Sequence, residues 1–209
     1  THFNCCYEVS KNTACEAYKL GSQIMAYKSV SAEDGRIDQR ELRNAFSRFA
    51  TGVTVITTTT SDGVNEALTA NSFATLSLDP PLVLWSLKSD APSREGFLLA
   101  KRFAINVLSA HQRKVADQFS QSGQHKFDGV EWHFGKIGCP LLDDHLAAFE
   151  CNTERTIESG DHLLFIGRVE RLSYGDGAAL VYSTGKYCMA SELPKDKKQR
   201  EPASSNILG

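Results

Sequence analysis

The sequence has no Cys-x-x-Cys pair, no long apolar run and almost no excess of charge of either sign. Without such a pair, neither a zinc site nor a thioredoxin-like redox site is expected. No run approaches the roughly 18 apolar residues of a membrane span, and the N-terminus lacks the basic start and apolar centre of a signal peptide. The net charge of -2 offers no basic face to nucleic acid. These absences favour a cytoplasmic protein with reduced cysteines.

Several catalytic motifs are also absent. Gly175-Asp176-Gly177 comes nearest to a dinucleotide fingerprint, but the third glycine is missing and the segment resembles a turn at a strand end. There is no Walker loop, no Gly-x-Ser-x-Gly elbow and no His-Glu-x-x-His pair. A nicotinamide cofactor, if one is used, is therefore not held by a Rossmann unit.

The 209 residues suit one well-buried domain with additions at both ends. Residues 1–37 are interpreted as an extension of unknown role, with a weak helical pattern over 14–27. The chain does not begin with Met, which suggests a trimmed or incomplete start. Cys5, Cys6 and Cys15 are expected as thiols, with a disulfide or a metal site as alternatives. Residues 191–209 are polar and predict a mobile tail or an arm on a partner subunit.

The segment 38–190 is dominated by predicted strands. A helix is expected from Asp38, with Glu41 completing a capping box, an apolar face that extends to Phe49, and an end at Gly52. Two further helices are expected near 92–100 and 111–119, the second with Ser109 and Gln112 placed for a capping box. Extended runs are predicted at 53–60, 67–77, 82–87, 103–108, 146–157, 162–172 and 179–182. This order predicts a mainly β, antiparallel barrel with a few flanking helices.

Three segments carry candidate chemistry, and each has a simpler alternative. The small polar side chains of 69–77 suit hydrogen bonding to a flat heterocycle, or face water on an ordinary edge strand. The turn Ser86–Ser93 before a predicted helix suits a phosphate group, or holds only a helix cap at Ser89 or Asp90. His162, which Asp161 could orient, is a candidate catalytic group or a polar surface residue. Asp143-Asp144-His145 can be imagined as a metal site, but is more simply a turn.

Five motifs in order together resemble the flavin reductase-like, FMN-binding split-barrel family, whose members include the reductase components of two-component flavin-dependent monooxygenases. They are Phe49–Thr57, Thr69–Phe73, Leu76–Leu82, Phe103–Leu108, and Gly160–His162 with Gly167–Val169. The resemblance covers 38–190 and implies a six-stranded split barrel. It also implies a homodimer with flavin sites near the subunit interface.

The resemblance further implies the residues of the site. His162 is expected to act at the flavin and nicotinamide, and Asn106 to be structural. The cofactor contacts that the resemblance implies are Thr69, Ala70, Asn71, Ser72, Phe73, Ser86, Lys88, Ser89, Ser93, Lys126, Phe127 and Tyr187. Lys88 and Asp90 stand where relatives are more neutral, so FMN and FAD both stay open, as do NADH and NADPH.

The implied activity is reduction of FMN or FAD by NAD(P)H, with the reduced flavin supplied to a separate monooxygenase. Hydride transfer between two stacked rings needs no protein nucleophile, which fits the missing catalytic motifs. Two other functions would use the same cofactor contacts. One is a flavin-binding or electron-transfer protein without reductase turnover, and the other is an oxidoreductase that acts on an organic substrate with bound flavin.

Overall fold

The computed structural model describes residues 15–20, 23–32, 36–123 and 125–192. They fall into two compact units, a smaller one up to Ala50 with Ser183–Gly185 and a larger one that contains the rest. The predicted domain limits at 38 and 190 stay a prediction, and the predicted tail lies outside the described residues from 193 onwards. Within the described chain, every helix is too short or too polar to cross a membrane.

The smaller unit begins with a hairpin of β1 (Cys15–Leu20) and β2 (Gln23–Lys28), in which Cys15 lies opposite Lys28 and Leu20 opposite Gln23. The weak helical pattern over 14–27 therefore does not correspond to a helix. Gly21-Ser22 separates the two runs in the sequence, and such a pair disfavours a continuous helix. Cys5 and Cys6 lie outside the described residues.

The helix α1 (Gln39–Phe46) has the predicted cap at Asp38, whose Oδ1 accepts hydrogen bonds from the backbone N–H groups of Arg40 and Glu41 at 2.9 and 3.1 Å. It ends at Phe46, so the expectation that it continues to Gly52 is wrong. No residue of α1 is buried, and the Phe46 side chain is 67% exposed. Among the described residues, the predicted apolar face is therefore largely exposed, with Leu42 at 37% and Phe49 at 79%.

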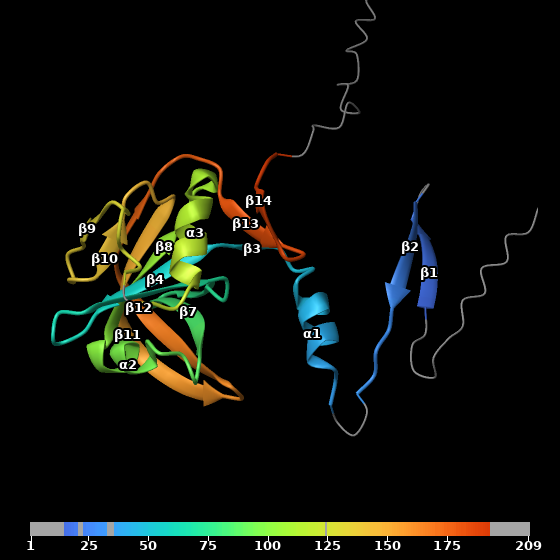
Figure 1. The fold of residues 1–209 in the computed structure, drawn as a ribbon, viewed down its shortest axis with the longest axis horizontal. Helices are drawn as coiled ribbons and strands as arrows, with labels where there is room; N and C mark the ends of the chain where they lie inside the picture. Colours follow the sequence, from blue (N-terminus) through green and yellow to red (C-terminus); the bar gives the residue numbers. More distant parts are fainter. Residues whose placement is uncertain (1–14, 21–22, 33–35, 124, 193–209) are drawn as a thin grey trace, which may run out of the picture. The chain divides into compact units, whose positions relative to one another are not determined.

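The larger unit is built on one antiparallel sheet (Figure 1). Its strands, in spatial order, are β5 (Asn65–Ala70), β4 (Thr54–Thr59), β8 (Arg102–Val107), β11 (Ala147–Ser159), β12 (His162–Tyr174), β7 (Pro81–Lys88) and β6 (Ala74–Leu78). The predicted mainly β, antiparallel class is confirmed. The sheet has seven strands where six were predicted, because the run expected over 67–77 is divided into β5 and β6.

The division of that run curls the sheet into a barrel. β5 and β6 lie at opposite edges of the sheet, yet only Asn71–Phe73 separates them in the chain. Since each residue spans at most about 3.6 Å, the two edges must approach each other at this point. The Ser72 hydroxyl holds the closure, because its Oγ accepts from the Ser86 N–H at 3.0 Å and lies 3.1 Å from the Ser86 carbonyl.

Helices and small sheets flank the barrel. The helices are α2 (Arg94–Ala100), a 3-10 turn (Ala110–Gln112) and α3 (Arg113–Ser120). β9 (Trp132–Phe134) pairs with β10 (Pro140–Leu142), and β13 (Leu180–Ser183) lies between β3 (Thr51–Gly52) and β14 (Lys186–Met189). The predicted capping box of Ser109 and Gln112 is confirmed. The cap of α2 is Ser93, not Ser89 or Asp90, and its side chain makes no cap bond.

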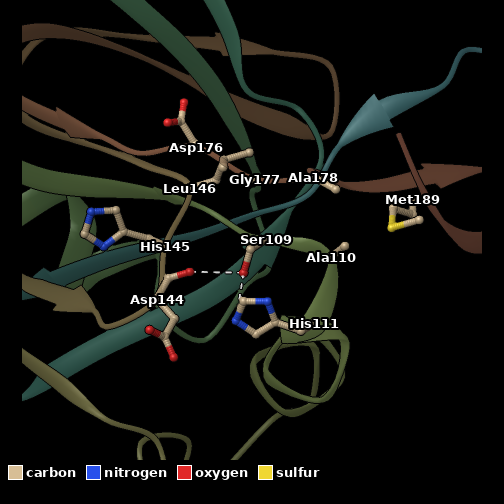
Figure 2. A pocket seen from close by; sticks show the side chains of 10 residues that line it. All are labelled: Ser109, Ala110, His111, Asp144, His145, Leu146, Asp176, Gly177, Ala178 and Met189. Carbon is tan, nitrogen blue, oxygen red and sulfur yellow. Dashed lines mark hydrogen bonds between the residues drawn. The ribbon is translucent and has the colours of Figure 1, made fainter. Parts of the chain in front are cut away.

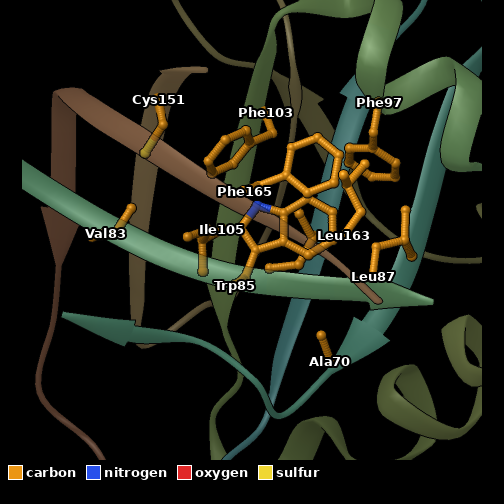
Figure 3. Packing of buried hydrophobic residues seen from close by; sticks show 11 residues of the cluster. Ala70, Val83, Trp85, Leu87, Phe97, Phe103, Ile105, Cys151, Leu163 and Phe165 are labelled. Atoms are coloured by element: carbon orange, nitrogen blue, oxygen red, sulfur yellow. The ribbon is translucent and has the colours of Figure 1, made fainter. Parts of the chain in front are cut away.

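An aromatic cluster fills the barrel (Figure 3). The Trp85 ring is stacked on the Phe165 ring with centroids 4.5 Å apart, and the rings of Phe97 and Phe103 meet Trp85 edge-on. A Cβ at Gly167 would collide with the Phe103 ring, so glycine is required where β12 approaches it. The cluster fixes β7 and β12, the two strands that carry Lys88 and His162.

Replacing Asn106 with Ala is expected to lower the free energy of unfolding by about 2–4 kcal/mol. Asn106 is fully buried; its Nδ2 donates to the Val55 carbonyl at 3.1 Å and its Oδ1 accepts from the Leu142 N–H at 2.9 Å. The substitution leaves both buried backbone groups without these partners. Urea unfolding measures the change, and the exposed Asn152→Ala is the matched control, expected within about 0.5 kcal/mol of the parent.

Candidate functional site

A cleft of ≈ 470 Å³ gathers most of the predicted site residues. It lies where β5, the end of β7, the start of α2 and the end of α3 converge. The predicted residues that line it are Thr69, Ala70, Asn71, Ser72, Ser86, Lys88, Ser93, Lys126 and His162. Segments far apart in sequence thus line one cleft on the larger unit.

The hydroxyl groups of Thr69 and Ser72 link the segments that line the cleft. Thr69 Oγ1 donates to the Ala116 carbonyl of α3 at 2.7 Å, and Ser72 Oγ is bonded to the backbone of Ser86. Both hydroxyl groups are engaged within the protein, and their part in binding a heterocycle stays a prediction. Asn71, which lies between β5 and β6, is exposed and makes no side-chain hydrogen bond to a described residue.

Two lysines line the cleft, from different segments of the chain. Lys88 at the end of β7 lies 4.0 Å from Asp90, and Lys126 Nζ donates to the Ala67 carbonyl at 2.8 Å. Burial lowers the pKa of Lys126 below its ordinary value, while the nearby Glu66 carboxylate raises it. Ser93 is 8% exposed. Two ammonium groups against one lining carboxylate favour an anionic ligand in the cleft.

His162 is the first residue of β12 and lies opposite Lys88 in the ladder. Its Nδ1 is 2.8 Å from the Asp161 carboxylate. The hydrogen bond and charge of His162 hold the pKa of Asp161 below its ordinary value. Since Nδ1 is engaged, Nε2 is the ring nitrogen left for a bound ligand. Asp161 thus orients the imidazole as the sequence suggested.

Four predicted cofactor contacts do not line the cleft: Phe73, Ser89, Phe127 and Tyr187. The Phe73 ring packs against Phe149 with centroids 5.7 Å apart, and the Phe127 ring packs edge-on against Phe119 at 5.1 Å. Tyr187 packs against Tyr182, and the Ser89 N–H donates to the Asp161 carbonyl at 2.9 Å. Their part in cofactor binding stays a prediction.

The cleft also contains residues that the sequence analysis missed, chiefly Phe119–Ser122 at the end of α3, with Leu68 and Leu87 as apolar wall. The Thr69–Ala116 hydrogen bond brings α3 beside β5. No local sequence pattern predicts a contact between two residues that lie so far apart in the chain. One signal was present: the polar run Ser120–Gly123 ends three residues before Lys126, a predicted cofactor contact.

One protein family matches most of the chain. Residues 46–191 match the family model described as the flavin reductase like domain. The chain belongs to the flavin reductase-like family. The predicted family is confirmed, and the expected class of enzyme agrees with it.

Named relatives support the assignment to flavin reductase-like proteins. A probable flavin reductase of Rhizobium meliloti is 44% identical over 150 residues, which are 72% of this chain and 48% of that protein. The FMN reductase (NADH) SmoA of Agrobacterium fabrum is 41% identical over 153 residues, 73% of this chain and 87% of its own length. The chain thus spans about half of the first relative and most of the second.

Two solved structures of similar proteins share the fold. The Streptomyces globisporus NADH:FAD oxidoreductase SgcE6, solved with NAD and FAD fragments, has a TM-score of 0.70 at 35% identity, covering 77% of this chain and 95% of that one. Nitrilotriacetate monooxygenase component B from Mycobacterium thermoresistibile has a TM-score of 0.71 at 32% identity, covering 78% and 93%. The expected split-barrel class agrees with these neighbours.

A second pocket of the flavin reductase-like domain, of ≈ 680 Å³, contains a Ser–His pair (Figure 2). Ser109 Oγ lies 3.3 Å from His111 Nε2, but it also lies 3.0 Å from the Asp144 carbonyl and 3.1 Å from Gln112 Oε1. A hydroxyl engaged with two acceptors as a helix cap is not an activated nucleophile. The pair is structural.

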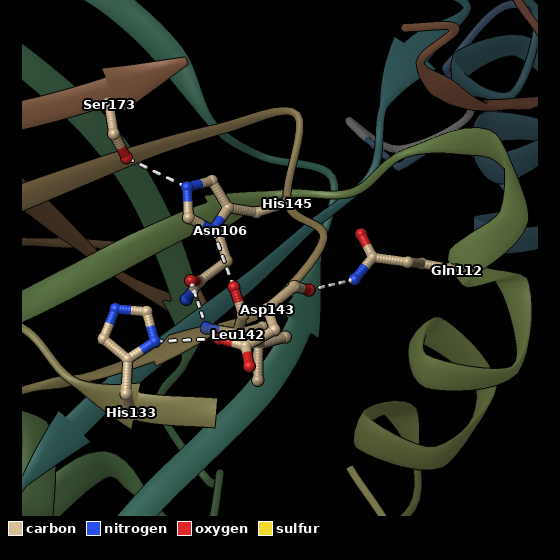
Figure 4. A network of polar contacts seen from close by, with 7 residues as sticks. All are labelled: Asn106, Gln112, His133, Leu142, Asp143, His145 and Ser173. Atoms are coloured by element: carbon tan, nitrogen blue, oxygen red, sulfur yellow. Dashed lines mark hydrogen bonds and ion pairs between the residues drawn. The ribbon is translucent and has the colours of Figure 1, made fainter. Parts of the chain in front are cut away.

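The imagined metal site at Asp143-Asp144-His145 is a hydrogen-bonded turn (Figure 4). Asp143 Oδ1 is 2.8 Å from His133 Nδ1, and the His145 ring bonds the Leu142 carbonyl at 2.6 Å and Ser173 Oγ at 2.9 Å. In the described part of the chain, no group of three or more His, Cys, Asp or Glu side chains is arranged around a metal position.

Proposed function

We propose that the chain is an NADH-dependent flavin reductase that supplies free reduced flavin to a separate monooxygenase. The observation that carries this proposal is the cleft, which is lined by two lysines, a buried serine and His162. Relatives named FMN reductase (NADH) and reductase component of a trigonelline monooxygenase support the nicotinamide and the partner.

The residues of the cleft fit a flavin nucleotide. Its volume of ≈ 470 Å³ lies within the range of ligand sites, and the partly buried Leu68 gives apolar surface for a planar ring. Lys88, Ser93 and Lys126 would hold the phosphate by charge-assisted hydrogen bonds. A flavin bound here supplies the acceptor for a hydride from the reduced nicotinamide. FMN and FAD both satisfy this phosphate site.

The chain's own part in the reaction is positioning. Asp161 holds Nδ1 of His162, which leaves Nε2 to orient the nicotinamide or to bond the flavin. No proton transfer by His162 is required, because hydride transfer moves both electrons and the hydrogen together. His162 is therefore a catalytic residue by contact, and Asp161 is a positioning residue.

The test is a mixture of purified protein with NADH or NADPH and with FMN or FAD, followed by the near-ultraviolet absorbance of the reduced nicotinamide. We expect oxidation well above the rate without protein, and faster with NADH. Oxidation at the protein-free rate with all four pairs would contradict the proposal. A tightly held yellow flavin with no turnover would instead identify a flavin-binding or electron-transfer protein.

We also infer a homodimer in the cytoplasm. The family resemblance supports the dimer, as does the exposed edge strand β6, in which Leu76 and Leu78 are 46% and 96% exposed. Consumption of NADH, a cytoplasmic reductant, supports the location. Sedimentation at the working concentration tests the dimer, and a purely monomeric species would contradict it.

Flavin affinity is expected to weaken as the pH rises from neutral to alkaline values. Only the protonated ammonium of Lys126 attracts a phosphate, and its lowered pKa makes it lose that proton at a lower pH than an exposed lysine does. Lys126→Met should weaken flavin binding about tenfold at neutral pH, and Lys126→Arg should remove the pH dependence. Fluorescence titration measures both. An unchanged pH profile in Lys126→Arg would exclude Lys126 as its cause.

A further inference from the structure

A third pocket, of ≈ 320 Å³, lies between the β9–β10 hairpin and the ends of β11 and β12. It shares no lining residue with the proposed flavin cleft. Its walls combine apolar side chains with cationic ones, a combination typical of small-molecule sites. The established family activity gives it no role.

The pocket is lined by the buried carboxylate of Glu150, and the charge of that carboxylate is balanced by Arg171. Glu150 is 5% exposed, and its Oε2 accepts from the Ile137 N–H at 2.9 Å. A side chain at Gly135 would collide with this carboxylate, so glycine lets the hairpin turn close over it. Arg171 Nε lies 3.6 Å from Glu150 Oε1. The guanidinium balances Glu150 while its terminal N–H groups make no bond to a described residue.

A second cation and two apolar side chains complete the pocket. Lys136 makes no ion pair with a described carboxylate, although it lines the pocket. Phe134 and Leu172 also line it and are 56% and 59% exposed, which is unusual for large apolar side chains. A cation without a partner beside uncovered apolar surface suits a ligand that has both an anionic and an apolar part.

Hydrogen bonds hold the pocket in shape without a ligand (Figure 4). His145 bridges the Leu142 carbonyl and Ser173 Oγ, and so ties the start of β11 to β12. His133 is held by Asp143 at 2.8 Å. A preformed pocket loses little entropy on binding, so that even a few contacts give measurable affinity.

We propose that this pocket binds a small organic carboxylate with an apolar or aromatic body. The carboxylate is paired by the terminal guanidinium nitrogens of Arg171 and the ammonium of Lys136, as planar carboxylates prefer. The body packs on Phe134 and Leu172. The separate lining of this pocket distinguishes its ligand from those of the flavin cleft.

The experiment titrates benzoate into the full chain by calorimetry, with and without FMN. We expect saturable binding with the same affinity in both series, and much weaker binding of benzyl alcohol, which lacks the charge, and of inorganic phosphate, which lacks the ring. Lys136→Gln should weaken benzoate about tenfold, while the exposed Lys114→Gln should leave it unchanged.

Four results would overturn the proposal. They are the absence of saturable benzoate binding at millimolar concentration, competition between benzoate and FMN, equal binding of either comparison compound, and unchanged affinity in Lys136→Gln. Reductase activity with NADH serves as the folding control, because Lys136 lies outside the flavin cleft. Benzoate binding can therefore fail while reductase turnover stands, and the reverse.

Discussion

His162→Ala is expected to lower kcat/KM for NADH by about 10²-fold, since misplacing a reacting group by a small distance costs about this much. The dissociation constant of FMN should change by less than about threefold, because Lys88, Ser93 and Lys126 would carry the phosphate contacts. Steady-state kinetics and flavin titration separate the two effects. An equal loss in flavin affinity and turnover would assign His162 to flavin binding alone.

Two variants sharpen this test. Asp161→Asn keeps a hydrogen-bond partner for His162 but removes the charge that orients its ring, so a smaller loss of kcat/KM is expected than in His162→Ala. His111→Ala is the matched control, since His111 is exposed and lies in the pocket that is separate from the cleft. Full activity in Asp161→Asn would show that the aspartate has no positioning role.

Strands were predictable where a run of residues was almost wholly β-branched or apolar. The β-branched run that became β4 and the apolar runs that became β8 and β12 were predicted close to their observed bounds. The separation of β5 from β6 was not, because Asn71-Ser72-Phe73 contains neither Gly nor Pro. That break arises from pairing with β4 on one side and β7 on the other, which is long-range information.

The site was predictable only as separate pieces. Short motifs suggested the Thr69–Phe73 strand, the Ser86–Ser93 turn and His162, and the fold brings all three segments to one cleft, although Phe73 and Ser89 do not line it. The direction of the side chains was not predictable: Thr69 and Ser72 are engaged with the protein, and Phe73 faces Phe149. Register and closure of the barrel decide such directions, and neither is encoded in the residues adjacent to a motif.

Trp85→Ala is expected to lower the free energy of unfolding by about 3–5 kcal/mol, the usual cost of deleting a large buried aromatic side chain. Trp85 is fully buried and touches three aromatic rings of the barrel interior (Figure 3). Its loss opens a cavity in the core against β7, the strand that carries Ser86 and Lys88, so flavin affinity should fall as well. Urea unfolding followed by circular dichroism measures stability, and the exposed Leu99→Ala is the control, expected within about 0.5 kcal/mol.

Trp85→Phe separates packing from hydrogen bonding at the same position. The indole Nε1 of Trp85 is buried and has no hydrogen-bond partner among the described residues. An unpaired buried donor costs about 1–3 kcal/mol, and phenylalanine removes that donor while keeping a ring against Phe165. The gain offsets part of the lost volume, so Trp85→Phe should be destabilised far less than Trp85→Ala. If the two variants are equally unstable, the indole N–H has a partner that the described residues do not supply.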